Sequence, residues 1–168
     1  MLGELNALET GRWRLRFTRQ LNHPIDRVWQ ALTKPEHLQA WFPQRITGDL
    51  LTPGAPLRFE EQQISFEGQV LAVEPPHLLE FSWGPDTIRL ELAATGGGCT
   101  LTLTDTIGEV GKAARDAAGW HVCLDRLEAA LDGKSASPES RDSWKAVHNE
   151  YVAAFGPKAS AIGPPEGY

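Results

Sequence analysis

Hydrophobic and polar residues alternate along several short segments of the chain. Trp13, Leu15, Phe17 and Leu21 share one parity, with polar residues between them. A period of two is typical of a β-strand that has one covered face. The alternation recurs between residues 45 and 107, where turn-forming runs such as TPGAP, WGPD and TGGG interrupt it. We therefore expect a first strand followed by an antiparallel meander of about six strands.

Other segments have apolar residues at helical spacing. In the longest of them Trp120, Leu124, Leu127 and Leu131 lie on one stripe, flanked by smaller residues. Such a stripe is typical of a helix that covers the apolar face of a sheet. The expected helices span residues 24–33, 35–42, 111–133 and about 139–155.

The order of these elements predicts an α+β fold. One curved antiparallel β-sheet of about seven strands would wrap around the long C-terminal α-helix, with two short helices after the first strand and an extra C-terminal helix. We expect a domain over residues 1–133, and then a linker, the extra helix and a flexible tail within residues 134–168. Because a curved sheet cannot press evenly on a straight helix, a cavity between them is expected.

Composition and charge exclude several classes of protein. The 168 residues carry a net charge of -6 and no basic run, so we expect no nucleic-acid partner. No segment approaches the roughly 18 apolar residues of a membrane span, and the start of the chain lacks the pattern of a signal peptide. Cys99 and Cys123 could form one disulfide, but two free thiols fit a reducing compartment better, so the expected location is cytoplasmic.

Several stretches of the chain resemble the START-like (SRPBCC, helix-grip) superfamily, and within it the branch of activators of heat-shock-chaperone ATPase homologues. The resemblance implies the helix-grip fold, which serves lipid carriers, cyclases and chaperone partners alike. Many members place a histidine where this chain has Asp105, so a role tied to that histidine is not carried over. The stretches are HPIDRVWQALTKPEHLQAWF (23–42), GQVLAVEPPHLLEFSW (68–83), LTLTDT (101–106) and GWHVCLDRLEAAL (119–131).

His121 and Cys123 lie close together in the expected long helix. Two residues on a helix are separated by about 200°, so the two side chains point apart and do not form a nucleophilic dyad. Cys123 is interpreted as a packing residue. His121 is either a boundary residue paired with a carboxylate or a polar group at the cavity rim. It shares a helix face with Asp125, but a third metal ligand is lacking, so we expect no metal and no cofactor.

Asp105 is a second candidate for chemistry. It shares the parity of Leu101 and Leu103, which would aim its carboxylate inward at the end of the last strand. The favoured interpretation is that it caps or braces the loop before the long helix, a common use of aspartate. The alternative is a general acid or base, which would need a cavity location and a raised pKa.

Large aromatic side chains are the strongest indication of function. Many of them are expected on the concave side of the sheet, where they either line a pocket for an apolar ligand or fill the space themselves. The expected ligand-binding residues are Phe59, Phe66, Phe81, Trp83, Leu90, Leu101, Trp120, His121 and Cys123.

The function predicted from these observations is the binding of a small hydrophobic molecule, such as a lipid, a polyketide or another aromatic, with no catalytic residue assigned. One alternative is an enzyme of the cyclase or hydratase kind that uses the same cavity, with His121 and Asp105 as candidates. Another is a chaperone-interacting module, which the resemblance implies. A homodimer is also considered, because an apolar stripe on the last helix must pack somewhere: Trp144, Val147, Tyr151 and Phe155.

Overall fold

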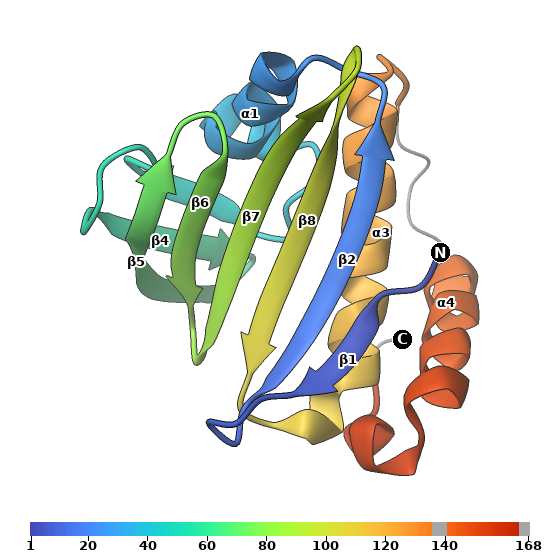
Figure 1. Ribbon diagram of the computed structural model, residues 1–168. Coiled ribbons are helices and arrows are strands. Elements are labelled where there is room, and N and C mark those ends of the chain that lie inside the picture. Colours follow the sequence, from blue (N-terminus) through green and yellow to red (C-terminus); the bar gives the residue numbers. More distant parts are fainter. Residues whose placement is uncertain (136–140, 165–168) are drawn as a thin grey trace.

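An open antiparallel β-sheet is the main element of the fold (Figure 1). The computed structural model of the chain describes residues 1–135 and 141–164. Within them the sheet has eight strands in the order β1-β2-β8-β7-β6-β5-β4-β3, so the second strand pairs with the last. The strands are β1 (Glu4–Ala7), β2 (Trp13–Leu21), β3 (Arg45–Gly48), β4 (Pro56–Glu61), β5 (Ile64–Glu74), β6 (Leu78–Trp83), β7 (Asp86–Thr95) and β8 (Gly98–Ile107).

One long helix covers the inner face of this sheet. Figure 1 shows α3 behind β2 and β8, with α4 beside it on the side away from β7. The predicted α+β helix-grip fold is confirmed, but the expected number of strands was one too low, because the four-residue β1 is too short to show alternation. The helices are α1 (Ile25–Thr33), α2 (Pro35–Leu38), α3 (Ala113–Leu131) and α4 (Arg141–Phe155), with short 3-10 turns η1 (Val110–Lys112) and η2 (Pro157–Ser160).

The inward parity predicted for the meander is confirmed in β4, β6, β7 and β8, where the alternate positions are buried and Trp83 is partly buried. Strand β5 alternates in the sequence only up to Val70 and then has the apolar run Val70–Val73. Its register against β6 shifts between Val70 and Ala72, which leaves Leu71 unpaired and exposed. A bulge of this kind moves the following side chains to the other parity, which hides the period of two.

Helix α3 is built for close packing on the sheet. Alanines in its first two turns and leucines in its last two turns give it a continuous buried stripe, and Gly133 ends it with a left-handed backbone, φ +70. Both cysteines are buried and free, so the expected pair of unbridged thiols is confirmed. The buried residues of α3 are Ala113, Ala114, Ala117, Ala118, Trp120, Cys123, Leu124, Leu127 and Leu131.

Helix α4 packs on α3 of the same chain. Tyr151 is fully buried, and its hydroxyl accepts a hydrogen bond from the backbone N–H of Gly3 at 2.9 Å. Its ring also meets Phe17 and Phe155, with centroids 6.4 and 5.2 Å away. The apolar stripe that suggested a homodimer is therefore used within the chain, and a dimer stays a prediction without that support. The boundary at residue 133 also stays a prediction, although α4 shares the core.

The chain after α4 was expected to be a flexible tail over residues 157–168. The flexibility stays a prediction, although residues 157–160 form η2, with Ala159 buried. The backbone N–H of Ile162 also donates to the carbonyl of Gly111 at 3.0 Å. Residues 165–168, and residues 136–140 of the expected linker, lie outside the described residues.

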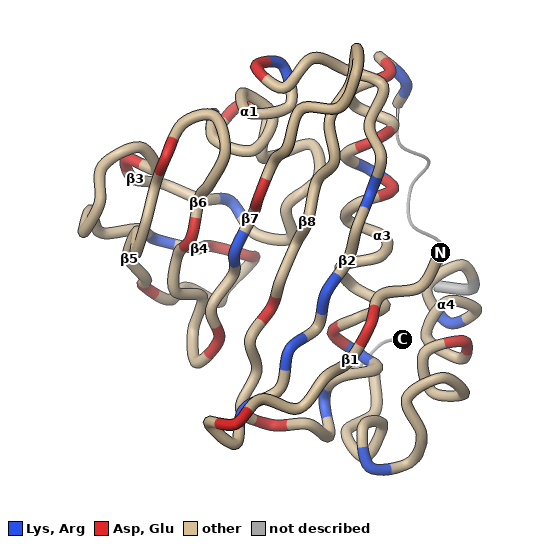
Figure 2. The backbone as a smooth tube through the Cα atoms, viewed as in Figure 1, with Lys and Arg blue, Asp and Glu red and all other residues tan. Residues whose placement is uncertain are grey.

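The outer face of the sheet is polar. Charged residues of both signs occur on neighbouring strands (Figure 2), and Arg89 pairs with Glu80 at 3.0 Å and with Glu91 at 3.1 Å. Only the inner face therefore needs a cover, which α3 supplies. Within residues 1–135 and 141–164, none of the helices is long and apolar enough to cross a bilayer.

Replacement of Tyr151 by alanine tests whether α4 belongs to the same cooperative unit. The change removes a fully buried ring and leaves the Gly3 N–H without its acceptor. We expect a loss of about 3–5 kcal/mol in the free energy of unfolding, measured by urea denaturation. Glu150→Ala, an exposed change on the same helix, should cost less than about 0.5 kcal/mol. Equal and small losses in the two variants would show that α4 unfolds separately.

Candidate functional site

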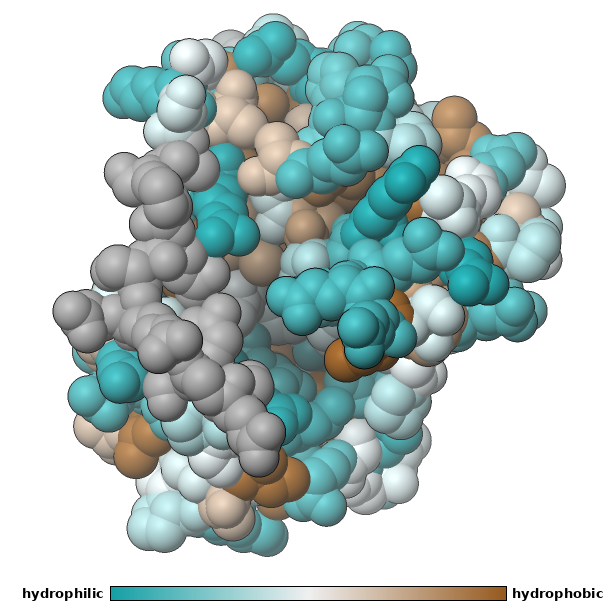
Figure 3. Space-filling view, turned by 180° about the vertical axis from the view of Figure 1, so that it is seen from behind, coloured by the Kyte–Doolittle hydropathy of each residue, from teal (hydrophilic) through white to brown (hydrophobic). Residues whose placement is uncertain are grey.

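A pocket of about 480 Å³ lies where the β4–β5 hairpin faces helix α3. It is larger than a pocket on the outer sheet face, of about 320 Å³, and one between α1 and α3, of about 170 Å³. On the helix side of the molecule the surface is hollowed, with apolar side chains between hydrophilic ones (Figure 3). The pocket is lined by Pro43, Glu61, Gln62, Ile64, Trp83, Arg115, Asp116, Gly119, Trp120, Cys123 and Trp144.

Two tryptophans form the inner wall of this pocket. The rings of Trp83 and Trp120 lie 5.2 Å apart between centroids, at 54° to each other. Each indole N–H is fixed: Trp83 donates to Oε1 of Gln44 at 2.9 Å, and Trp120 donates to Oδ2 of Asp105 at 2.9 Å. Because a buried indole N–H needs a partner, these two bonds set how the rings present their apolar faces.

Beneath these rings the space between sheet and helix is filled by other aromatics. Phe42 is the centre of the cluster, with ring centroids 6.2 Å from Phe59, 6.0 Å from Phe81 and 5.7 Å from Trp120. Phe42 was not among the residues expected here, because a helix was expected up to residue 42. Instead, α2 ends at Leu38, and the chain then turns and directs the ring inward. The aromatic side chains were expected either to line a pocket or to fill the space between sheet and helix. The inner rings fill this space, and the outer rings line the pocket that remains.

The nine residues expected to bind a ligand do not all lie at the pocket. Trp83, Trp120 and Cys123 line the pocket. Phe66 is partly buried, stacks on a core ring at 5.1 Å and contacts Trp83 at 6.2 Å, so it supports the wall. The remaining apolar ones are buried deep in the core, away from the pocket lining: Phe59, Phe81, Leu90 and Leu101.

His121 faces helix α4 and is not among the pocket-lining residues. Its Nδ1 lies 3.0 Å from the hydroxyl of Tyr151, and its Nε2 lies 3.8 Å from Oδ2 of Asp125. Burial lowers the pKa of the imidazole, and the charge of Asp125 opposes this only in part. The interpretation as a boundary histidine near a carboxylate agrees with this geometry, and the interpretation as a rim residue does not.

Gly119 opens the pocket at the middle of α3. A glycine in a helix that faces a sheet often allows close approach of the two, but here a Cβ at this position would meet nothing within 4 Å. The residue lies on the lining instead. The missing side chain therefore leaves free space beside Trp120.

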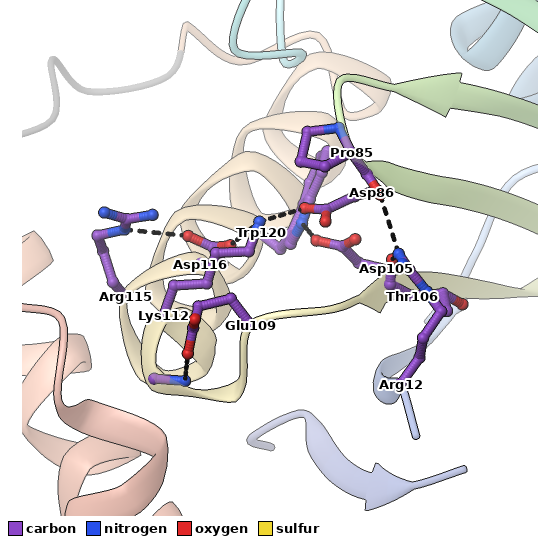
Figure 4. Close-up of polar contacts among 11 residues, drawn as sticks. Arg12, Pro85, Asp86, Asp105, Thr106, Glu109, Lys112, Arg115, Asp116 and Trp120 are labelled. Atoms are coloured by element: carbon purple, nitrogen blue, oxygen red, sulfur yellow. Dashed lines mark hydrogen bonds and ion pairs between the residues drawn. The ribbon is translucent and has the colours of Figure 1, made fainter. Parts of the chain in front are cut away.

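Behind Trp120 lies a cluster of three carboxylates, of which Asp86 and Asp105 are buried, while Asp116 is partly buried and also lines the pocket (Figure 4). Asp105 is fully buried, and its carboxylate accepts a hydrogen bond from the indole of Trp120 on α3. We had favoured a contact with the loop before the long helix. Burial and then the charge of Asp86 raise the pKa of Asp105 to about 8. Burial also raises the pKa of Asp86, whose Oδ2 accepts from Nζ of Lys112 at 2.6 Å.

Oxygen atoms of Asp86, Asp105 and Asp116 lie within 4.8 Å of one another, a spacing that a metal ion could use. The ammonium of Lys112 already lies there, 3.4 Å from Oδ2 of Asp116. The positive charge that a metal ion would bring to these carboxylates therefore comes from a lysine of the same chain. The sequence analysis missed Asp86, although it shares the parity of inward positions in β7 and could have been found in this way.

A curved antiparallel sheet that grips one long helix, with a pocket where the two diverge, defines a START-like helix-grip protein. The family model for Activator of Hsp90 ATPase homolog 1-like protein matches residues 22–132, and the chain belongs to this family. No curated protein matches the chain.

Solved structures of similar shape agree with this assignment. A conserved protein of unknown function, EF2215 from Enterococcus faecalis, has a TM-score of 0.79 at 20% identity over 91% of this chain and 90% of its own. The crystal structure of CalU16 from Micromonospora echinospora has a TM-score of 0.73 at 26% identity over 91% and 98%. DynU16, a protein in the dynemicin biosynthetic locus, has a TM-score of 0.64 at 30% identity, over 73% of this chain and 48% of its own.

Gly119→Ala tests whether the space at the middle of α3 is open. A glycine inside a helix costs about 1 kcal/mol relative to alanine, and the added methyl group meets no neighbour. The free energy of unfolding should therefore rise by about 0.5–1 kcal/mol in chemical denaturation. A decrease would mean that the pocket is closed at this point.

Proposed function

We propose that the protein binds a small apolar molecule with an aromatic ring in the pocket between α3 and the β4–β5 hairpin. The observation that carries this proposal is the open space of about 480 Å³ beside Trp83 and Trp120. Ligand pockets typically have volumes of about 300–1,000 Å³ and combine apolar walls with few polar groups. The cytoplasmic location stays a prediction.

The lining supports a flat ligand with a polar edge. Two indole faces and the exposed side chain of Ile64, at 67% exposure, offer apolar contact. Polar groups lie on both sides of the same pocket, from Glu61 and Gln62 on the hairpin to Arg115 on α3. An aromatic ring would lie against the indoles by offset or edge-to-face contact, while its polar substituents would meet these outer groups.

Binding without chemistry is favoured over the cyclase or hydratase alternative. A general acid or base must reach the reacting atoms directly or through one water molecule. Among the two candidates, His121 faces α4, and Asp105 lies fully buried behind the ring of Trp120. Neither is part of the pocket lining.

A similar solved structure suggests a small-molecule ligand, whereas the family description suggests a protein partner. DynU16 is described as a protein in a biosynthetic locus, which supports a role near a small molecule for proteins of this shape. The family description refers to activation of the Hsp90 ATPase, which would require a surface contact instead. If the pocket is the functional site, adding this protein to an Hsp90-type chaperone should leave the ATPase rate unchanged. A stimulated rate would favour the surface role.

Gly119→Leu should block the proposed site. The leucine side chain would extend from α3 into the free space beside Trp120 without entering the packed core. We expect the fluorescent probe 8-anilinonaphthalene-1-sulfonate to bind the natural protein and to bind this variant at least about tenfold more weakly. Gly119→Ala should have a smaller effect in the same direction.

Ala129→Leu is the matched control, because it adds a leucine on the same helix outside the pocket lining. It should bind the probe as the natural protein does. Because partly unfolded proteins also bind this probe, circular dichroism must show that each variant keeps its fold. Equal probe affinity for Gly119→Leu and Ala129→Leu would contradict the proposed function.

A further inference from the structure

The three carboxylates of the cluster behind Trp120, two of them buried, come from three parts of the fold. Asp86 begins β7 and Asp105 lies near the end of the adjacent strand β8, so both inward side chains reach the same end of the sheet. Asp116 and Lys112 approach from the first turn of α3 and the residue before it. Figure 4 shows these side chains converging next to the indole N–H of Trp120.

Two oxygen atoms in this group lack a donor. Oδ2 of Asp86 accepts from Lys112 and Oδ2 of Asp105 accepts from Trp120, but the Oδ1 atom of each is buried with no hydrogen-bond partner among the described residues. Both residues are almost fully buried, at 3% and 0% exposure. A buried acceptor without a donor is costly, and two ionised carboxylates in the same buried cluster would be more so.

The charges around these atoms leave one carboxylate unbalanced. Lys112 faces Asp86 and Asp116, and Arg115 bonds to Asp116 at 3.1 Å, so two cations serve three carboxylates. Arg12 lies just before β2, and its guanidinium donates to the carbonyls of Pro85 and Thr106. Its charge lowers the pKa of Asp86, but less than Lys112 does, and it forms no ion pair with Asp105 among the described residues. Glu109 accepts from the N–H of Gly111 and adds no cation.

We propose that the pair Asp105 and Asp86 holds one proton, and that protonated Asp105 is a positioning residue that holds Trp120 in the pocket wall. The proton turns one unpartnered buried oxygen into a donor and removes the charge of a carboxylate that no cation pairs with among the described residues. The raised pKa of Asp105, caused first by burial and then by the charge of Asp86, agrees with this arrangement.

A divalent cation is the competing occupant of the cluster. It would have to displace the ammonium of Lys112, which already contacts two of the three carboxylates. Such ions also require about six oxygen ligands, and the cluster brings three carboxylates together. The proton needs no displacement and no further ligand.

The consequence for the pocket rests on the proposed function. Removing the proton places two adjacent buried anions behind Trp120, and the repulsion between Asp105 and Asp86 is relieved only if one carboxylate moves. Because Oδ2 of Asp105 fixes the indole, such movement changes the pocket wall. Ligand affinity should therefore be higher at pH 6 than at pH 9.5.

The stability of the fold should depend on the same proton. An unfolded chain releases it near the ordinary pKa of 3.8, while the folded chain keeps it up to about 8. Between these values the folded state binds more protons, so the free energy of unfolding falls as the pH rises from 4 to 8 and levels off above.

Asp105→Asn imitates the protonated state, because its amide can donate to Asp86 and its carbonyl can accept from Trp120. We expect this variant to lose the pH-dependent fall of stability between pH 4 and 8. Asp125→Asn is the matched control, since it makes the same change at a side chain with 55% exposure on α3, outside the carboxylate cluster, and it should keep the fall. An unchanged profile in Asp105→Asn would overturn the proposal.

Nuclear magnetic resonance of the indole N–H groups in the unmodified protein gives an independent test. The Trp120 resonance should shift with an apparent pKa near 8, whereas that of Trp83, bound to the neutral Gln44, should not. The proposal is overturned if Trp120 does not titrate between pH 6 and 10. It is equally overturned if Mg²⁺ or Ca²⁺ raises the melting temperature of the natural protein and not of Asp105→Asn.

Titration with 8-anilinonaphthalene-1-sulfonate at pH 6 and 9.5 separates this inference from the proposed function. Weaker binding at pH 9.5 that disappears in Asp105→Asn supports both. Equal binding at the two pH values overturns the positioning role while leaving a ligand site in place. If the probe binds at neither pH but Trp120 titrates, the shared proton is supported and the proposed function fails.

Discussion

The structure depends on the need to bury one face of an open, curved sheet. Its outer face is polar and carries ion pairs such as Arg89 with Glu80, so only the inner face requires a cover. Helix α3 provides it with alanines and leucines, and α4 packs in turn on α3 through the fully buried Tyr151. Because apolar burial is the main force that stabilises a fold, the positions of both helices follow from this face.

A straight helix and a curved sheet cannot remain in contact along their whole length, and the aromatic residues show where they separate. Phe42, Phe59 and Phe81 fill the inner part of the gap, and Trp83 and Trp120 close it toward the pocket. The absence of a side chain at Gly119 keeps the remaining space open. The pocket therefore results from the shape of the fold together with one small residue.

Much of the fold could be predicted from the sequence, because a period of two assigns inward positions directly. The prediction failed where a position depends on a distant partner or on a local irregularity. The bulge after Val70 hid the pattern of β5, and Phe42 enters the core only because α2 ends early. For Asp105 parity gave the direction of the side chain, but not its partner Trp120, which lies on another element. The contact of His121 depends in the same way on how α4 packs.

The proposed function requires that the space beside Trp83 and Trp120 holds a ligand. A crystal structure of the protein purified without added ligand would show its contents. We expect continuous electron density for a flat molecule against the two indoles and over Gly119. Density for ordered water alone, or side chains of Ile64 and Trp144 that close the space, would contradict it.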